Sequence, residues 1–270
     1  MPVNQNRPLA TLPPPIRIPP MANPKQPAIR ASVAAIGRSG LIAWRALADL
    51  RTWAPQVLGL MRRLGVESIP IAVFLALFTG IVLALLASYI FTGAVPTYFV
   101  GTLVTKAVLM ELGPVLTGMA LAGRVGANVA AELGTMRVTE QVDALETLSY
   151  NPHAYLVVPR VVAATLMFPV VTAIAMGVGV TSGWLTSLAT LDISTTEFVK
   201  GARFFYLFKD IWYGLVKAAS FGMAVSLAGA IQGLRTRGGA EGVGRATTRA
   251  VVVGCMAILV LDAFWAMVLL

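Results

Sequence analysis

The sequence predicts an all-α polytopic membrane protein with an interfacial helix near its amino terminus, five transmembrane helices and a short cytoplasmic helix among them. Of the 270 residues, 57% are hydrophobic and 12% are charged, whereas a soluble domain is typically about 25% charged. This apolar surplus exceeds what a core can bury, so it faces lipid. The single cysteine and the single histidine exclude an internal disulfide and a zinc site with the usual ligand spacings.

Residues 1–30 are predicted to be a proline-rich, flexible cytoplasmic leader. They contain nine prolines and no acidic residue, and they lack the continuous apolar stretch of a signal peptide. A flexible tail accounts for this composition without a further function.

Residues 31–67 are predicted to form an interfacial amphipathic helix. Apolar residues recur at helical spacing, but five arginines interrupt them, which is too many for a span. Trp44 and Trp53 suit a helix that lies among lipid headgroups, and we expect a break near Pro55. A helix packed on another subunit is the alternative.

Residues 68–270 are predicted to contain all five spans. The first, at residues 69–91, has no charge in 23 positions, which is long enough to cross the hydrocarbon with some tilt. The third block is too long for one ideal span, so we expect it to tilt, kink near Pro169 or extend past the membrane. The last four spans are expected at about residues 97–123, 155–191, 211–234 and 250–270, with a polar segment at 192–210 and a basic glycine-rich loop at 235–249.

A short amphipathic helix is predicted between the second and third spans, at residues 138–148. Val138, Val142 and Leu145 share one face, and acidic residues lie opposite them. The chain has no G-x-x-x-x-G-K-[ST] phosphate-binding motif, so any nucleotide hydrolysis would need a separate ATPase, and this helix could couple to it. An interfacial helix without a partner is the alternative.

The distribution of basic residues predicts a cytoplasmic amino terminus and an external carboxyl terminus. With that orientation, sixteen of the 21 lysines and arginines lie in cytoplasmic segments, three lie outside and two lie within spans, as the positive-inside rule expects. The basic segments flank apolar ones without aromatic stacking platforms, which argues against nucleic acid as a partner.

Four ionisable residues lie within the predicted spans: Lys106, Glu111, Lys217 and Asp262. A charge in hydrocarbon costs at least about 2.5 kcal/mol, so they indicate either ion pairs that hold helices together or a role in substrate passage. At a rise of 1.5 Å per residue, Lys106, Lys217 and Asp262 lie about 13, 9 and 12 Å from the outer ends of their predicted spans. These three are expected to pair, and Glu111, at about 21 Å, is a poorer match.

Three segments, at residues 110–160, 238–252 and 259–264, resemble the MlaE (YrbE) permease family. They contain ELGP, AGRVGA, AELGTM, TEQVDAL and RATTR in the family's order, and the resemblance covers roughly residues 35–270. It implies a homodimeric ABC transporter permease of a bacterial inner membrane that moves phospholipid or a similar lipid. The implied partners are two cytoplasmic ATPase subunits, which would bind ATP and Mg, and an MCE-domain protein on the outer side. No catalytic residue, metal or cofactor is implied for this chain itself.

The resemblance also implies roles for particular residues. Leu83, Ile90, Phe91 and Glu111 would line an outward-facing lipid cavity at the dimer interface. Many family members have a glutamine where this chain has Leu86, so no polar lipid contact is implied there, and the leader has no counterpart in the family. The coupling helix would present seven residues to the ATPase: Thr139, Glu140, Gln141, Asp143, Ala144, Leu145 and Glu146.

Two other classes fit parts of the sequence. An ion-coupled secondary carrier would use the four charges within the spans as its relay, but it predicts internal repeats, and the spans show none. A scaffold without transport activity would recruit partners through the leader and the basic loops. Association with an ATPase that has a Walker motif would separate the ABC permease from both.

Overall fold

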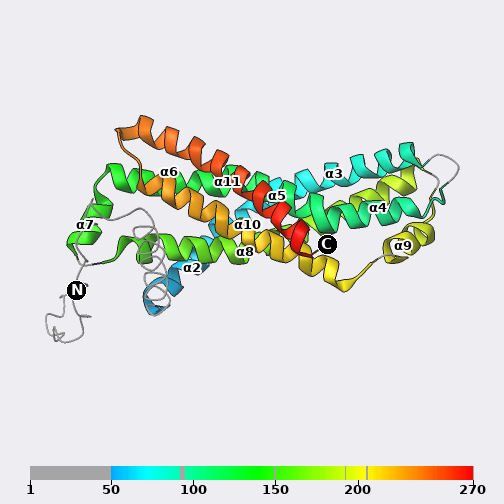
Figure 1. The fold of residues 1–270 in the computed structure, drawn as a ribbon, viewed down its shortest axis with the longest axis horizontal. Coiled ribbons are helices and arrows are strands. Elements are labelled where there is room, and N and C mark those ends of the chain that lie inside the picture. The colour runs from blue at the N-terminus through cyan, green and yellow to red at the C-terminus, as the bar shows by residue number, and fades with distance from the viewer. Residues whose placement is uncertain (1–49, 92–94, 149, 192, 205, 270) are drawn as a thin grey trace, which may run out of the picture.

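The computed structural model describes residues 50–91, 95–148, 150–191, 193–204 and 206–269. Within these ranges every regular element is helical, and five helices are long and apolar enough to cross a membrane, which confirms the predicted fold class. Figure 1 shows an elongated bundle with α7 at one end and α9 at the other. The leader and residues 31–49 of the predicted interfacial helix lie outside the described residues.

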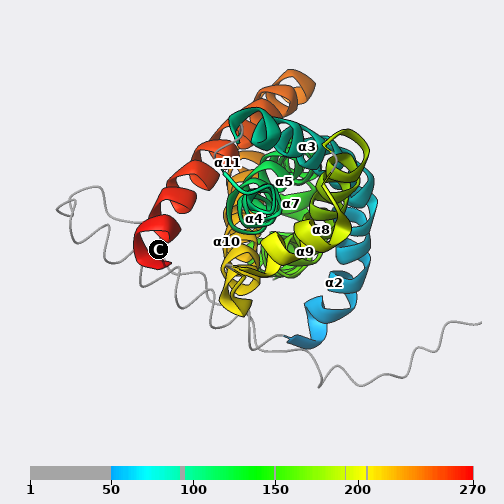
Figure 2. The same ribbon diagram turned by 90° about the vertical axis from the view of Figure 1, so that its right-hand side faces the viewer.

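Helix α2 (Leu50–Leu64) is the described part of the predicted interfacial helix. The expected break near Pro55 is wrong, because the helix continues through this residue. A proline inside a helix removes the hydrogen bond to the carbonyl four residues earlier and crowds that turn, which can bend a helix without ending it. Val57, Leu60 and Leu64 are buried, and α2 packs along α8, so its apolar face has a partner within the chain. Figure 2 shows α2 and α11 on opposite sides of the bundle.

The first span is α3 (Ile69–Ile90), which follows the short 3-10 turn η2 (Val66–Ser68) and agrees with the predicted residues. Ala72, Ala76, Gly80 and Ala84 form its buried face. A Cβ atom at Gly80 would lie 2.0 Å from the carbonyl oxygen of Gly179 on α8. This stripe of small residues therefore lets α3 and α8 pack with their backbones close together.

The second span is a continuous helical path of 40 residues that contains two π-helical turns. A π turn has i→i+5 hydrogen bonds and so inserts an extra residue into the helix, and such turns are frequent at functional sites. The second of these turns lies within the segment 110–160 that resembles the permease family, and the first overlaps its start. The path consists of α4 (Phe99–Ala107), η3 (Val108–Leu112), α5 (Gly113–Leu121), η4 (Ala122–Gly126) and α6 (Ala127–Val138).

The third span begins with the π turn η5 (His153–Val157) and continues as α8 (Val158–Thr190). Helix α8 has 33 residues and is continuous through Pro169. At 1.5 Å per residue it is about 50 Å long, which exceeds the hydrocarbon thickness of about 30 Å. The helix continues through Pro169, and its length leaves tilt and extension past the membrane as the expected outcomes; α8 packs against α2.

The fourth and fifth spans are α10 (Phe208–Leu234) and α11 (Gly239–Leu269). Helix α11 begins eleven residues before the expected span, so the prediction of a loop over residues 235–249 is wrong for most of that segment. The turn between α10 and α11 is short because Gly238 and Gly239 have φ values of 87° and 68°, a conformation that glycine adopts without strain. The polar residues after Gly239 therefore continue into α11 instead of forming a loop.

The polar segment before the fourth span contains α9 (Thr195–Phe204), which packs on α4. The backbone N–H and hydroxyl of Ser194 donate to the Glu197 carboxylate at 3.1 and 3.2 Å, and these hydrogen bonds lower the pKa of Glu197. The Thr102 hydroxyl donates to the carbonyl of Gly201 at 2.7 Å. Helix α9 is therefore capped at its start and fixed to the beginning of the second span.

Replacing Gly201 with alanine is expected to lower the free energy of unfolding by about 1–3 kcal/mol, the usual effect of overpacking. A Cβ atom at this position would lie 1.7 Å from the carbonyl oxygen of Tyr98, so the two helices would have to separate. The matched control is Gly177→Ala on α8, where nothing lies within 4 Å of the added atom. Thermal unfolding in detergent measures both variants, and equal melting temperatures would contradict the close α4–α9 contact.

Candidate functional site

A cluster of charged and polar groups surrounds Lys217 of α10 inside the bundle. The Lys217 side chain has no solvent-exposed surface, and its Nζ lies 2.8 Å from Oε2 of Glu111 on η3 and 2.5 Å from Oδ1 of Asp262 on α11. It also donates to the Tyr213 hydroxyl and to the Met110 carbonyl, both at 3.3 Å. One lysine thus joins three helical segments through their polar groups.

The backbone around the ELGP segment explains how Lys217 reaches this position. Pro114 has no N–H group, so it cannot bond to the carbonyl of Met110 four residues earlier, and that carbonyl accepts from Lys217 instead. A Cβ atom at Gly214 would lie 2.4 Å from the carbonyl oxygen of Leu109. The glycine therefore lets α10 approach η3 closely enough for the lysine to bridge them.

The structure confirms part of the predicted pairing and corrects the rest. Lys217 pairs with Asp262 as expected, but Glu111 belongs to the same cluster and Lys106 does not. A straight helix overestimates the depth of Glu111 because it lies in a π turn, which packs an extra residue into the helix. The long lysine side chain spans the remaining difference. Lys106 pairs with Asp210 at 2.8 Å.

Asp210 was not among the predicted site residues, because it is the last residue of the polar segment expected at 192–210. The side chain is 3% exposed, and its Oδ2 accepts a hydrogen bond from the backbone N–H of Leu207 at 3.0 Å. An acidic residue in the first turn of an apolar helix is a known capping pattern, so this signal was present. Asp210 caps α10 and compensates the Lys106 charge.

The Lys217 cluster contains one cation and two carboxylates, with a tyrosine hydroxyl between them. The Tyr213 hydroxyl donates to Oε1 of Glu111 at 3.4 Å, and the lysine ammonium lies 4.7 Å from the centre of the Tyr213 ring. Lys217 is enclosed, whereas the Glu111 side chain is 40% exposed. The arrangement stabilises a charge inside the bundle and leaves one carboxylate accessible from the side of the helices.

The four residues expected at a lipid cavity do not gather around a hollow within one chain. Leu83 and Phe91 are half-buried and pack on a core cluster formed by α3, α4, α8 and α9. Ile90 is 56% exposed and Glu111 is 40% exposed, so both are accessible on the outside of the chain. Leu86, where a polar lipid contact was not expected, is also exposed. The cavity at a dimer interface therefore stays a prediction.

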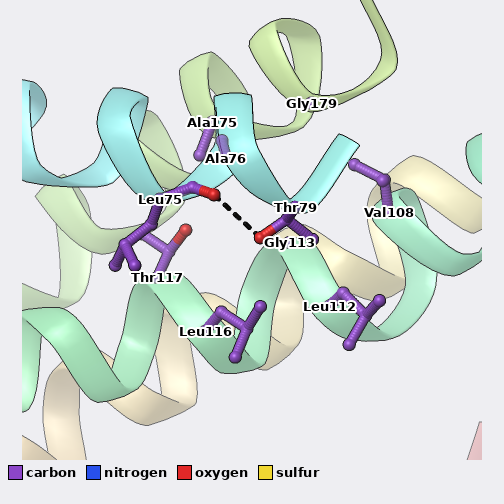
Figure 3. Close-up of a pocket in the computed structure, with 10 residues that line it drawn as sticks. All are labelled: Leu75, Ala76, Thr79, Val108, Leu112, Gly113, Leu116, Thr117, Ala175 and Gly179. Carbon is purple, nitrogen blue, oxygen red and sulfur yellow. Dashed lines mark hydrogen bonds between the residues drawn. The ribbon is translucent and has the colours of Figure 1, made fainter. Parts of the chain in front are cut away.

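Figure 3 shows a small, partly open hollow where α3, η3, α5 and α8 meet. The Thr79 hydroxyl donates to the Leu75 carbonyl on one side of it. Its volume is about 10 Å³, enough for one water molecule and far too small for a lipid. An open groove of about 390 Å³ lies between α3 and α8 and is lined by Leu77, Ala173, Ile174, Gly177, Val178, Thr181, Ser182 and Leu185.

Helix α7 (Gln141–Thr147) corresponds to the short helix predicted at residues 138–148. It lies at one end of the bundle (Figure 1). Val142 is buried in the main core cluster and Leu145 packs against it, whereas the other six predicted coupling residues are exposed. Arg137 at the end of α6 forms an ion pair with Asp143. The helix is thus anchored by one apolar face and presents an acidic face outward.

Glu140, the residue that precedes α7, has a φ angle of 60°. A left-handed conformation costs a residue with a side chain roughly 1–2 kcal/mol. Strained residues of this kind persist only where the surrounding structure holds them, and they are frequent at functional sites. This turn sets the direction of α7 relative to α6.

The family model described as Permease MlaE matches residues 57–268. A "Probable ABC transporter permease protein" of Rickettsia felis is 44% identical over 198 residues, 73% of this chain and 76% of the relative. The "Intermembrane phospholipid transport system permease protein MlaE" of Haemophilus influenzae is 32% identical over 235 residues, 84% and 89% of the two chains. The Arabidopsis thaliana protein "TRIGALACTOSYLDIACYLGLYCEROL 1, chloroplastic" is 35% identical over 75% of this chain and 58% of its own length.

Proposed function

Because this chain belongs to the MlaE family of ABC transporter permeases, we propose that it forms the membrane path along which phospholipid or a similar lipid moves. In this proposal two copies form a homodimer in a bacterial inner membrane. A separate cytoplasmic ATPase binds ATP and Mg and drives transport, and an MCE-domain protein exchanges lipid on the outer side. The amino terminus and α7 face the cytoplasm.

The observation that carries the ATPase part of the proposal is the acidic face of α7. A helix that lies on anionic lipid is usually basic. Glu140, Asp143 and Glu146 are exposed here, and Arg137, the nearby cation, is paired with Asp143. These carboxylates repel an anionic membrane surface, so the face suits a protein partner with basic residues.

A second feature fits α7 to a protein partner. Leu148 and Tyr150, which follow the acidic face, are 68% and 52% exposed. Aromatic and large apolar side chains beside a polar rim are typical of protein interfaces. The exposed residues of α7 and the two apolar residues after it form a surface that an ATPase subunit could bind and displace.

The lipid path is proposed at the dimer interface, with Ile90 and Glu111 exposed toward the partner subunit and Leu83 and Phe91 behind Ile90. An apolar cavity needs shape and few polar groups to hold a lipid. ATP binding would move α7, and α6 would carry this movement toward the Lys217 cluster beside Glu111. The cavity would then alternate between open and compressed states, with the equilibrium set by the nucleotide.

The test is purification of the tagged chain from its native membrane, followed by lipid transport in vesicles. We expect an ATPase with a Walker motif to copurify, and fluorescent phospholipid to move only when Mg and ATP are present. The buried Lys217 cluster favours one rival, an ion-coupled carrier. Lipid movement that needs an ion gradient and continues without nucleotide would support that rival and overturn the proposal.

A further inference from the structure

A second group of charges connects helix α2 to α6, the helix that leads from the second span to α7. Glu132 of α6 lies between two arginines: Arg63 at the end of α2 forms an ion pair with its Oε1, and Arg160 of α8 lies 3.1 Å from its Oε2. The Arg160 side chain is 10% exposed and also donates to the Leu156 carbonyl at 2.6 Å. One carboxylate therefore joins three helices, and its attachment to α8 is largely buried.

The position of Glu132 within α6 links this group of charges to α7. Glu132 precedes Val138, the last residue of α6, by six residues on the same uninterrupted helix. Helix α7 is tied to α6 by the Arg137–Asp143 ion pair and by the burial of Val142. These contacts connect α7 to Arg63 of α2 through α6 and Glu132.

A separate ion pair makes a similar connection about two turns earlier in the second span. Arg124 of the π turn η4 lies 3.1 Å from Oε2 of Glu67, which is in the turn between α2 and α3. Gly65 at the same elbow lies against Met167 of α8, where a Cβ atom would approach within 2.2 Å. The elbow between α2 and α3 is thus held on two sides by the second and third spans.

We propose that Glu132, through Arg63, is a positioning residue that makes the interfacial helix α2 move together with α6 during transport. The Glu67–Arg124 pair acts in the same way at the α2–α3 elbow. This inference rests on the proposed function, because it assumes that an ATPase moves α7. According to this inference, α2 moves during transport and rotates the first span, which carries Leu83, Ile90 and Phe91.

The first experiment measures coupling with the permease and its copurified ATPase in phospholipid vesicles. Arg63→Gln is expected to leave ATP hydrolysis within twofold of the wild type but to lower the lipid moved per ATP about fivefold or more, within the usual range of coupling between sites. Arg63→Lys should restore the ratio. Arg62→Gln is the matched control, because Arg62 is the exposed neighbour on the same helix and has no ion pair among the described residues.

Two results of this experiment would overturn the inference. The first is an Arg63→Gln variant with the same lipid-to-ATP ratio as Arg62→Gln. The second is a loss of lipid transport, ATP hydrolysis and folded protein in the same proportion, which is what a purely structural ion pair predicts. If the wild-type complex itself moves no lipid with ATP, the proposed function fails instead, and the next measurement still decides whether the connection exists.

The second experiment measures the distance between α2 and α6 in the permease alone. Spin labels at Leu58, which is 73% exposed, and at exposed Thr135 can be introduced after Cys255→Ser, which removes the single cysteine of the chain. Arg63→Gln should broaden the distance distribution, and Arg62→Gln should not. Glu67→Arg should also broaden it, and Glu67→Arg combined with Arg124→Glu should narrow it again. Unchanged distributions in all variants would overturn the connection.

Discussion

Replacing Lys217 with methionine is expected to lower the free energy of unfolding by about 3–5 kcal/mol, the usual cost of removing one partner of a buried ion pair. The variant keeps a long flexible side chain, but it leaves the carboxylates of Glu111 and Asp262 without the cation that lies 2.8 and 2.5 Å from them. The Met110 carbonyl loses its donor as well. Two neighbouring anions inside the bundle then repel each other, so α10, η3 and α11 separate more easily.

Unfolding in a mixed detergent titration measures this effect, and Lys209→Met is the control because Lys209 is exposed at the start of the same helix. Two single variants, Lys217→Met and Asp262→Leu, distinguish a structural role of the cluster from a role in lipid passage when lipid transport and the amount of folded protein are both measured. If lipid transport falls further than the amount of folded protein does, the cluster acts in transport. Normal transport with normal protein levels in both variants would remove that role, and a Lys217→Met variant as stable as Lys209→Met would contradict the described geometry.

Reversing two charges on α7, with Glu140→Lys and Glu146→Lys together, is expected to weaken ATPase binding about 100-fold and to abolish ATP-driven lipid transport. Like charges brought together at an interface cost several kcal/mol, and about 3 kcal/mol corresponds to this change in affinity. Both side chains are exposed, and the anchors of α7, Val142 and the Arg137–Asp143 pair, are unchanged. The permease should therefore fold normally.

Copurification of the ATPase and the melting temperature of the permease measure binding and folding separately. Glu241→Lys is the control, because Glu241 is an exposed acid of the same end of the bundle that lies on α11 outside α7. Retention of the ATPase by the double variant would argue against α7 as the contact surface. A melting temperature well below that of the control would show that the substitutions act on folding instead.

The spans were predictable from the sequence because their apolar length is a property of neighbouring residues. The α3 limits and the carboxyl end of α10 agree with the expected ones. The start of α11 was missed because its first three turns contain Glu241, Arg245 and Arg249 and so lack the hydropathy of a span. These polar turns lie beside α6, where they extend the helix beyond the apolar region.

Helix α9 was not predicted, although its sequence carried a signal. Ser194 and Glu197 form the reciprocal side-chain to backbone hydrogen bonds of a capping box, which marks a helix start even in a polar segment. Hydropathy alone hides such a helix because only Phe198 and Gly201 of its ten residues are buried.

The charged site was predicted in composition but only partly in its pairing. Lys217 and Asp262 were matched by depth along their spans, which requires only the helical rise. Glu111 and Asp210 depend on features that a rise calculation omits: a π turn, a missing N–H at Pro114 and the start of α10 at Phe208. The ion pairs of Glu132 depend on which helices are neighbours, which a single sequence does not specify.

The two π turns have a consequence for the phase of the second span. Each adds one residue to the helix, so the faces before and after it are offset by about 100° relative to an uninterrupted α-helix. The span therefore has three successive frames, with Lys106 in the first, Glu111 at the first shift and Arg124 at the second. A single helical wheel drawn for residues 99–138 would place these charges on the wrong sides. Deleting a residue of η3 that precedes Glu111 would rotate Lys106 away from Asp210 while Glu111 still faced Lys217.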